Sequence, residues 1–196
     1  MFIKKILKRI LIVSILFTFT IGSISCKPKS LTQTVIESNK LATEWLLNNM
    51  RRKGIFVYMY NVKRERRSRK NNMIRQLMGS RLLAELASND PSLRGMHKRN
   101  LRFIFKYWYK EKDDKGYIFY HNKSKLGAIG MALRTLVYSP YFEEYKDKAK
   151  KLCNSILSLM NKAGGFEPFF IEPKYKYSKK RLLYFYSGEA ILSLVD

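Results

Sequence analysis

The stretch Lys125-Leu-Gly-Ala-Ile-Gly-Met-Ala-Leu-Arg-Thr-Leu-Val137 is apolar on nearly every face of a helix. Its glycines and alanines allow neighbouring backbones to come close, so we expect a helix buried in the interior. Two further stretches have the same character: Asn72–Ser88, and a segment that begins near Tyr184 and runs almost to Asp196. These three stretches are the predicted inner helices of a helical domain.

A second kind of helix precedes each of them. These helices have one apolar stripe and otherwise polar faces, which is typical of helices with one side in water. In the first of them the stripe consists of Val35, Ala42, Trp45 and Leu46. The predicted ranges of these outer helices are Leu31–Arg52, Ser92–Tyr109 and Tyr141–Lys162.

Short aromatic segments connect the two kinds of helix, and each begins at a glycine. They are Gly54–Tyr60, Gly116–Tyr120 and Gly165–Phe170. Self-similarity at this spacing predicts a stacked or closed repeat architecture. We therefore predict an all-α domain over residues 31–196, built of α/α hairpin repeats that form a partial toroid, with short aromatic β-like connecting segments. An up-and-down bundle or an open solenoid is the alternative.

Several short motifs support the ring, and they follow one another in a consistent order: Gly54-x-Phe56-x-Tyr58-x-Tyr60, Asn72-Met-Ile-Arg-Gln76, Lys125-Leu-Gly-Ala128, Gly164-Gly-Phe166 and Tyr186-Ser-Gly-Glu-Ala190. In this the chain resembles bacterial α/α toroids of the six-hairpin type, in particular domains similar to the C-terminal part of glucuronyl C5-epimerases. The resemblance implies a ring with roughly twice the three hairpins seen here. We therefore expect either a truncated relative or an oligomer in which a partner completes the ring.

The N-terminus has the composition of a secretory signal. Lys4, Lys5, Lys8 and Arg9 precede an apolar run, and the run ends in small residues before Cys26. The apolar run is too short to cross a membrane. Gly22–Cys26 resembles the lipobox of bacterial lipoproteins, although Ser23 stands where that family usually has an aliphatic residue. We expect a signal peptide over residues 1–25, a lipidated tether over 26–30 and lipid attachment at Cys26; a simple signal peptide is the alternative.

The charge is strongly positive. The whole chain carries +24, and +20 remains once the four basic residues of the signal are removed. Such an excess points to anionic partners, which are lipid headgroups, acidic glycans or another anionic polymer such as a phosphopolymer. We expect no nucleic acid partner, because the signal predicts export to the cell envelope. The densest basic run, Lys63–Lys70, is either a solvated loop or a strip that lies on anionic lipid.

Ligand cavities in α/α rings usually lie over one end of the inner helices. Polar and aromatic residues gather at the predicted N-termini of these helices, where helix dipoles favour anions. Aromatic rings offer flat faces for sugar rings. The candidate binding residues are Arg75, Gln76, Lys125, Tyr58, Tyr60, Tyr120, Tyr186 and Glu189. Two alternatives stay open: Arg75 and Glu189 form a structural ion pair, and the tyrosines serve only packing.

The sequence favours binding over catalysis. Glycoside hydrolysis needs two carboxylates at a defined separation, and nothing in the spacing connects Glu167 with Glu189. A glycan epimerase, lyase or hydrolase is the alternative function, and a basic peripheral membrane protein without a pocket is the third. No metal or cofactor is expected, since His97 and His121 lie apart. Cys153 falls on the apolar stripe of a predicted helix and is interpreted as a core residue.

Overall fold

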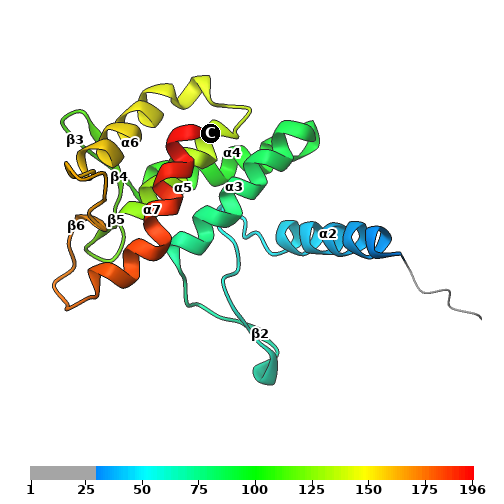
Figure 1. Cartoon of the computed structure of the whole chain (residues 1–196). Coiled ribbons are helices and arrows are strands. Elements are labelled where there is room, and N and C mark those ends of the chain that lie inside the picture. The colour runs from blue at the N-terminus through cyan, green and yellow to red at the C-terminus, as the bar shows by residue number, and fades with distance from the viewer. Residues whose placement is uncertain (1–29) are drawn as a thin grey trace, which may run out of the picture. The chain divides into compact units, whose positions relative to one another are not determined.

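The structure, a computed structural model, describes residues 30–196 (Figure 1). It contains six α-helices within that range: α2 Leu31–Asn48, α3 Met73–Asn89, α4 Arg94–Tyr107, α5 Leu126–Val137, α6 Lys146–Ser158 and α7 Lys179–Val195. Short antiparallel pairs connect them: β1 Tyr60–Asn61 with β2 Arg66–Arg67, β3 Tyr109–Lys112 with β4 Lys115–Ile118, and β5 Ser124–Lys125 with β6 Phe169–Ile171. The prediction of a helical protein with short strand-like connections is confirmed at this level.

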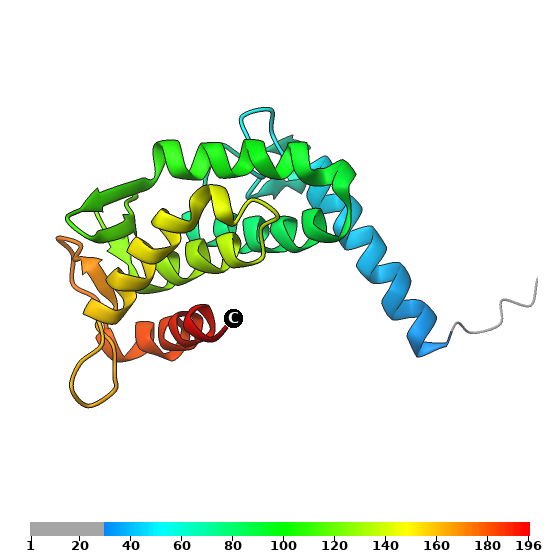
Figure 2. The same ribbon diagram turned by 90° about the horizontal axis from the view of Figure 1, so that it is seen from above.

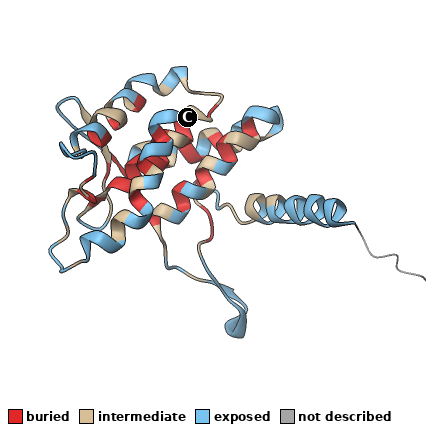
Figure 3. Ribbon diagram, viewed as in Figure 1, coloured by how far each residue is buried: buried red, intermediate tan, exposed pale blue. Residues whose placement is uncertain are grey.

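The chain divides between Thr43 and Glu44 into two compact units. The larger unit, residues 44–196, contains every helix from α3 to α7 and is the part described below. Its central element is α5, which contacts α3, α6 and α7 (Figures 1 and 2). Figure 3 shows α5 as the most buried of these helices. The sequence Lys125–Val137 therefore forms the core helix that its composition predicts.

The close packing of α5 against α7 depends on two glycines of α5. A Cβ on Gly130 would lie 2.9 Å from the carbonyl oxygen of Glu189, and one on Gly127 would overlap the Glu189 carboxylate. Ala190 and Ser193 of α7 are buried at the same contact. Small residues let the two backbones approach closely, as the composition of Lys125–Val137 predicts.

Side-chain capping marks where two of the inner helices, α3 and α7, begin, whereas α5 has no side-chain cap. The Asn72 side chain accepts a hydrogen bond from the Arg75 amide at the start of α3 (3.3 Å), and the Ser178 hydroxyl accepts one from the Arg181 amide at the start of α7 (3.3 Å). The predicted start of the last helix near Tyr184 was therefore wrong by about one turn. Ser178 is an ordinary N-cap signal that places the start at Lys179.

The outer helices are shorter than predicted. A 3-10 turn, Pro91–Leu93, precedes α4, and another, Glu143–Tyr145, precedes α6. α2 ends at Asn48 rather than at Arg52, and none of its residues is buried. Trp45, predicted to lie on a buried stripe of this helix, is 57% exposed. The apolar pattern of Leu31–Arg52 therefore predicted the helix but not its burial.

The connecting segments are true structural repeats. After α2, Met50 pairs with Phe56; after α6, Met160 pairs with Phe166. Both turns contain a glycine with positive φ, Gly54 at 93° and Gly164 at 80°. The predicted repeat placed Gly165 rather than Gly164 opposite Gly54 and was wrong by one residue. The two adjacent glycines made the register ambiguous in the sequence, and the left-handed conformation resolves it.

One hydrogen bond recurs in all three turns. The carbonyl just after each outer helix accepts the amide of the residue three positions after the turn glycine: Val57 to Asn49 (2.8 Å), Phe119 to Trp108 (2.7 Å) and Glu167 to Leu159 (2.8 Å). The apolar residue directly before each of these amides is buried, namely Phe56, Ile118 and Phe166. The three helix ends are thus followed by turns that share one hydrogen bond and one buried apolar residue.

The prediction that all three inner helices are buried on most faces is correct only for α5. α7 buries Tyr186, Ala190 and Ser193, whereas Tyr184 is 72% and Phe185 70% exposed. In contrast to α5, which has packed neighbours on several sides, α7 packs mainly on α5. Within residues 30–196, no helix is long and apolar enough to cross a membrane.

Candidate functional site

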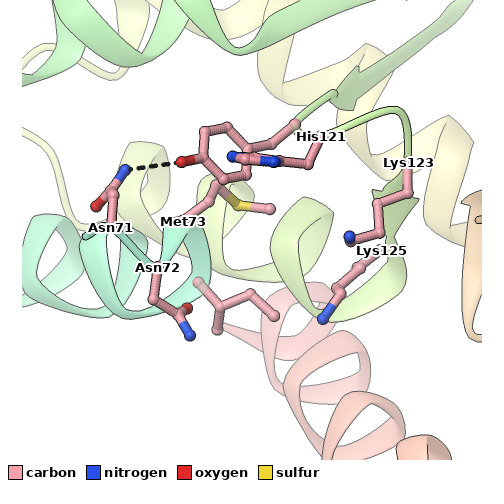
Figure 4. A pocket seen from close by; sticks show the side chains of 8 residues that line it. Asn71, Asn72, Met73, His121, Lys123 and Lys125 are labelled. Atoms are coloured by element: carbon pink, nitrogen blue, oxygen red, sulfur yellow. Dashed lines mark hydrogen bonds between the residues drawn. The ribbon is translucent and has the colours of Figure 1, made fainter. Parts of the chain in front are cut away.

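A pocket lies at the N-terminal ends of α3 and α5, where the sequence predicts a ligand site. Its volume is about 260 Å³. Figure 4 shows Asn71 and Asn72 on one side of it and Lys123 and Lys125 on the other. The complete lining is Asn71, Asn72, Met73, Ile74, Tyr120, His121, Lys123 and Lys125.

The start of α3 contributes free backbone donors to the pocket. The Arg75 amide bonds to the Asn72 side chain, and the Gln76 amide bonds to the Asn72 carbonyl (3.0 Å). The amides of Met73 and Ile74 lie in the first turn of α3, where no carbonyl of the helix can accept a hydrogen bond from them. Together with the positive end of the helix dipole, they favour an anion at this end of the pocket.

Two lysines supply the full positive charges. Lys123 lies in the loop before β5, and Lys125 ends β5 and directly precedes α5. Both are half-buried, and neither forms an ion pair within the part of the chain that the structure describes. The Lys125 ammonium lies 5.5 Å from the centre of the Tyr186 ring, and that of Lys123 lies 5.0 Å from the Tyr175 ring. Aromatic contacts thus orient both cations while leaving them free to meet an anion.

Tyr120 forms the aromatic part of the lining. It is held edge-on against Trp108, with ring centres 5.6 Å apart, and His121 contacts it at 4.2 Å. The Asn71 side-chain amide donates a long hydrogen bond to its hydroxyl (3.4 Å). The ring is therefore held in place by its neighbours and remains half-exposed beside the pocket.

Gln76, a predicted binding residue, instead has a structural role. Its side-chain oxygen accepts the Phe56 amide (2.7 Å), and its nitrogen donates to the Phe56 carbonyl (2.8 Å) and to the Asn71 side chain (2.9 Å). Gln76 is 3% exposed and Phe56 6%. Its amide oxygen and both amide hydrogens are thus engaged, two of these bonds fix the first turn against α3, and Gln76 does not line the pocket.

Arg75 and Glu189 are also not brought together. Arg75 is exposed on α3, and no ion pair connects it with Glu189. One carboxylate oxygen of Glu189 is buried without a hydrogen bond, beneath Gly127. Burial raises the pKa of this carboxyl group, while the nearby charges of Lys125 and Arg134 partly oppose that shift. The interpretation of Arg75 and Glu189 as a structural pair was therefore wrong.

The other predicted tyrosines do not converge on the pocket. Tyr186 is buried between α5 and α7 and serves packing, apart from its contact with Lys125. Tyr60 is 51% exposed on β1, and Tyr58 precedes it on the same segment. Only Tyr120 and Lys125 of the eight predicted residues line the pocket.

The sequence reasoning missed Asn71, His121 and Lys123 as pocket residues. Lys123 lies two positions before Lys125, on the other side of the buried Ser124. Alternation along the strand would have placed Lys123 and Lys125 on the same face, which was the available signal. His121 directly follows Tyr120 and has a positive φ of 51° in a tight turn, a backbone conformation that the sequence does not predict for this residue.

Two chemically reactive side chains lie outside this pocket and have other roles. His97 is completely buried, bonds Ser139 through Nε2 (2.7 Å), and has a pKa lowered to about 4 because burial disfavours the charged ring. Cys153 packs half-buried against the core, and burial raises the pKa of its thiol. No cluster of three or more metal-ligating side chains exists among residues 30–196.

The expected signal peptide and Cys26 lie outside the described residues. No family model, curated protein or solved structure matches this chain.

Proposed function

We propose that this protein binds an acidic saccharide in the pocket between the N-termini of α3 and α5. The observation that carries the proposal is that Lys123 and Lys125 line one small space together with Met73 and Ile74, the first residues of α3, whose amides have no intrahelical acceptor. Ammonium groups and helix-terminal amides are the donors that bind a carboxylate.

The aromatic wall supports a sugar rather than a simple anion. Tyr120 is fixed by Trp108 and Asn71 and offers part of its ring to the pocket. A sugar ring with its carboxylate toward the lysines could stack there. The pocket volume of about 260 Å³ lies below the roughly 300–1,000 Å³ of sites that enclose drug-sized ligands. The ligand is therefore one acidic unit of a longer glycan whose other units remain in solvent.

The rest of the proposal concerns place and architecture. The basic, apolar and small residues up to Cys26 support export to the bacterial cell envelope and a lipid anchor at that cysteine. The three repeats, with α5 between α3 and α7, support a partial toroid of α/α hairpins. An oligomer would complete such a ring.

Binding is better supported than glycan processing. Glu167 pairs with Lys179, and the Glu189 carboxylate is buried under Gly127, so neither lines the pocket. A hydrolase of the two-carboxylate type would need both beside the sugar.

The test is calorimetric titration of the full chain with a glucuronic acid oligomer and with its neutral glucose counterpart. We expect binding of the acidic oligomer only. The variant Lys123→Gln/Lys125→Gln should lose about 100-fold or more in affinity, since hydrogen bonds to charged groups contribute about 1.5–3 kcal/mol each and every 1.4 kcal/mol is about tenfold. The matched control is Lys110→Gln/Lys112→Gln, which removes two exposed charges from β3. Equal losses in both variants, or none in the first, would contradict the proposal.

A further inference from the structure

The basic run Lys63–Lys70 is part of an ordered hairpin rather than a loop without structure. Tyr60 pairs with Arg67 and Asn61 with Arg66 across β1 and β2. The turn between the strands is a 3-10 helix, Val62–Arg64, capped by the Asn61 side chain, which accepts the Arg64 amide (3.0 Å). Figure 1 shows this hairpin projecting from the domain beside the start of α3.

One hydrogen bond closes the base of the hairpin, and a second connects the base to Arg51. The Ser68 amide donates to the Met59 carbonyl (2.8 Å), and the Arg51 guanidinium donates to the Ser68 carbonyl (2.9 Å). A protruding hairpin with two such bonds at its base presents its tip in a defined conformation.

Six cations and a single carboxylate occupy the hairpin between positions 61 and 70. All six are exposed, and none forms an ion pair within residues 30–196. They surround an open hollow of about 980 Å³. The cations are Lys63, Arg64, Arg66, Arg67, Arg69 and Lys70, and the carboxylate is Glu65. Such a concentration of unpaired positive charge attracts anionic partners.

Apolar side chains stand among these charges. At the tip, Val62, the first residue of the turn, is 79% exposed, and nearer the base Tyr60 and Met59 are 51% and 42% exposed. No core residue covers them, as the uniformly exposed hairpin in Figure 3 also shows. An apolar tip flanked by lysine and arginine matches the boundary between lipid headgroups and acyl chains, where cations meet phosphate and apolar groups enter.

We infer that the hairpin Tyr60–Lys70 docks the protein on an anionic lipid surface. Its basic residues bind the headgroup phosphates, and Val62 enters the interface at the tip. A nucleic acid would also attract the cations, but its phosphate backbone gives no environment for Val62. The surface is separate from the saccharide pocket, because the two share no lining residue.

The test measures binding of the full chain carrying Cys26→Ser to two kinds of vesicle, phosphatidylcholine alone and phosphatidylcholine mixed with phosphatidylglycerol. For each protein, the quantity compared is the ratio of its affinities for the two kinds of vesicle. Any salt-independent attachment contributes to both affinities and cancels in this ratio. The hairpin variant replaces Lys63, Arg64, Arg66 and Arg67 with Gln. The matched control replaces four exposed cations of a different surface, Arg52, Lys53, Arg102 and Lys106, with Gln.

We expect the preference for anionic vesicles to fall by about 100-fold in the hairpin variant and by much less in the control. This follows from about fivefold per basic residue at an anionic surface, not all of which engage at once. In the wild type the preference should also collapse at high salt, and Val62→Ser should weaken binding to the anionic vesicles at every salt concentration.

Three outcomes would overturn the inference. Equal losses in both variants would show that net charge alone is responsible. Unchanged vesicle binding, with lost binding to a DNA oligomer, would assign the hairpin to nucleic acid. Unchanged binding in Val62→Ser would remove the apolar tip from the interface. None of these results bears on the Lys123 and Lys125 variants, so failure of this inference and of the saccharide proposal are distinguishable.

Discussion

Replacing Gln76 with leucine should destabilise the protein strongly although the substitution adds apolar surface. The side chain satisfies both the amide and the carbonyl of Phe56, at 2.7 and 2.8 Å, in a site where both residues are nearly inaccessible to water. Leucine has a similar volume and cannot bond to either group. Each buried polar group left without a partner costs about 1–3 kcal/mol.

The expected loss follows from these terms. Two orphaned backbone groups of Phe56 cost about 2–6 kcal/mol, and burying the leucine side chain returns about 1.5–3 kcal/mol. We therefore expect the free energy of unfolding to fall by about 2 kcal/mol, a sizeable part of the usual 5–15 kcal/mol of a domain. Denaturation by urea, followed by circular dichroism at 222 nm, measures this difference.

Arg75→Leu is the matched control, because it introduces the same side chain at the neighbouring position of α3, where the residue is exposed. We expect a change within about 0.5 kcal/mol there. A Gln76→Leu protein with the wild-type unfolding midpoint would refute the structural role of Gln76, and with it the contact between the first turn and α3.

Three further predictions concern stability. The pKa of His97 is near 6.5 in the unfolded chain and about 4 in the folded protein, so the unfolded state binds more protons between these pH values. The free energy of unfolding should therefore fall by about 3 kcal/mol from pH 7 to pH 4. Urea midpoints measured over a pH series should show a smaller fall in His97→Gln. Because the pKa of Glu189 is raised in the folded protein, its charged form destabilises the protein above that pKa. Glu189→Gln should therefore raise the melting temperature at pH 7 and leave it unchanged in acid. A gain that does not depend on pH would contradict the raised pKa of Glu189. Gly54→Ala and Gly164→Ala both force alanine into a positive φ, which costs about 1–2 kcal/mol. Only at position 54 would the new Cβ also lie 2.5 Å from the Arg99 carbonyl oxygen. Calorimetry should therefore find Gly54→Ala clearly more destabilising, and equal losses would contradict the packing of that turn.

The sequence predicted the elements of this fold better than their surroundings. Lys125–Val137 has one composition on all faces, and only a central position in the core is compatible with it. The last helix has a similar composition, yet it exposes Tyr184 and Phe185 because only one inner helix packs against it. Composition reports what a helix can bury, and the presence of a partner decides what it does bury.

The sequence named only part of the lining of the candidate pocket. The positions of helix N-termini and their connecting segments are local properties of the sequence, and they named Tyr120 and Lys125, which line the pocket. The role of Gln76 depends on Phe56, twenty positions earlier in the chain, and no local pattern connects the two. The same holds for Glu189, whose burial comes from the absence of a side chain at Gly127 on another helix.

The most direct test of the saccharide pocket is a titration of the ¹⁵N-labelled protein with a glucuronic acid oligomer, followed by amide chemical shifts. Bound carboxylate at the start of α3 should shift the amides of Met73 and Ile74 first, together with those of residues 120–125. The matched neutral oligomer should leave them in place. Shifts confined to residues 61–70 would show that the acidic oligomer binds the basic hairpin, and they would contradict the pocket as its site.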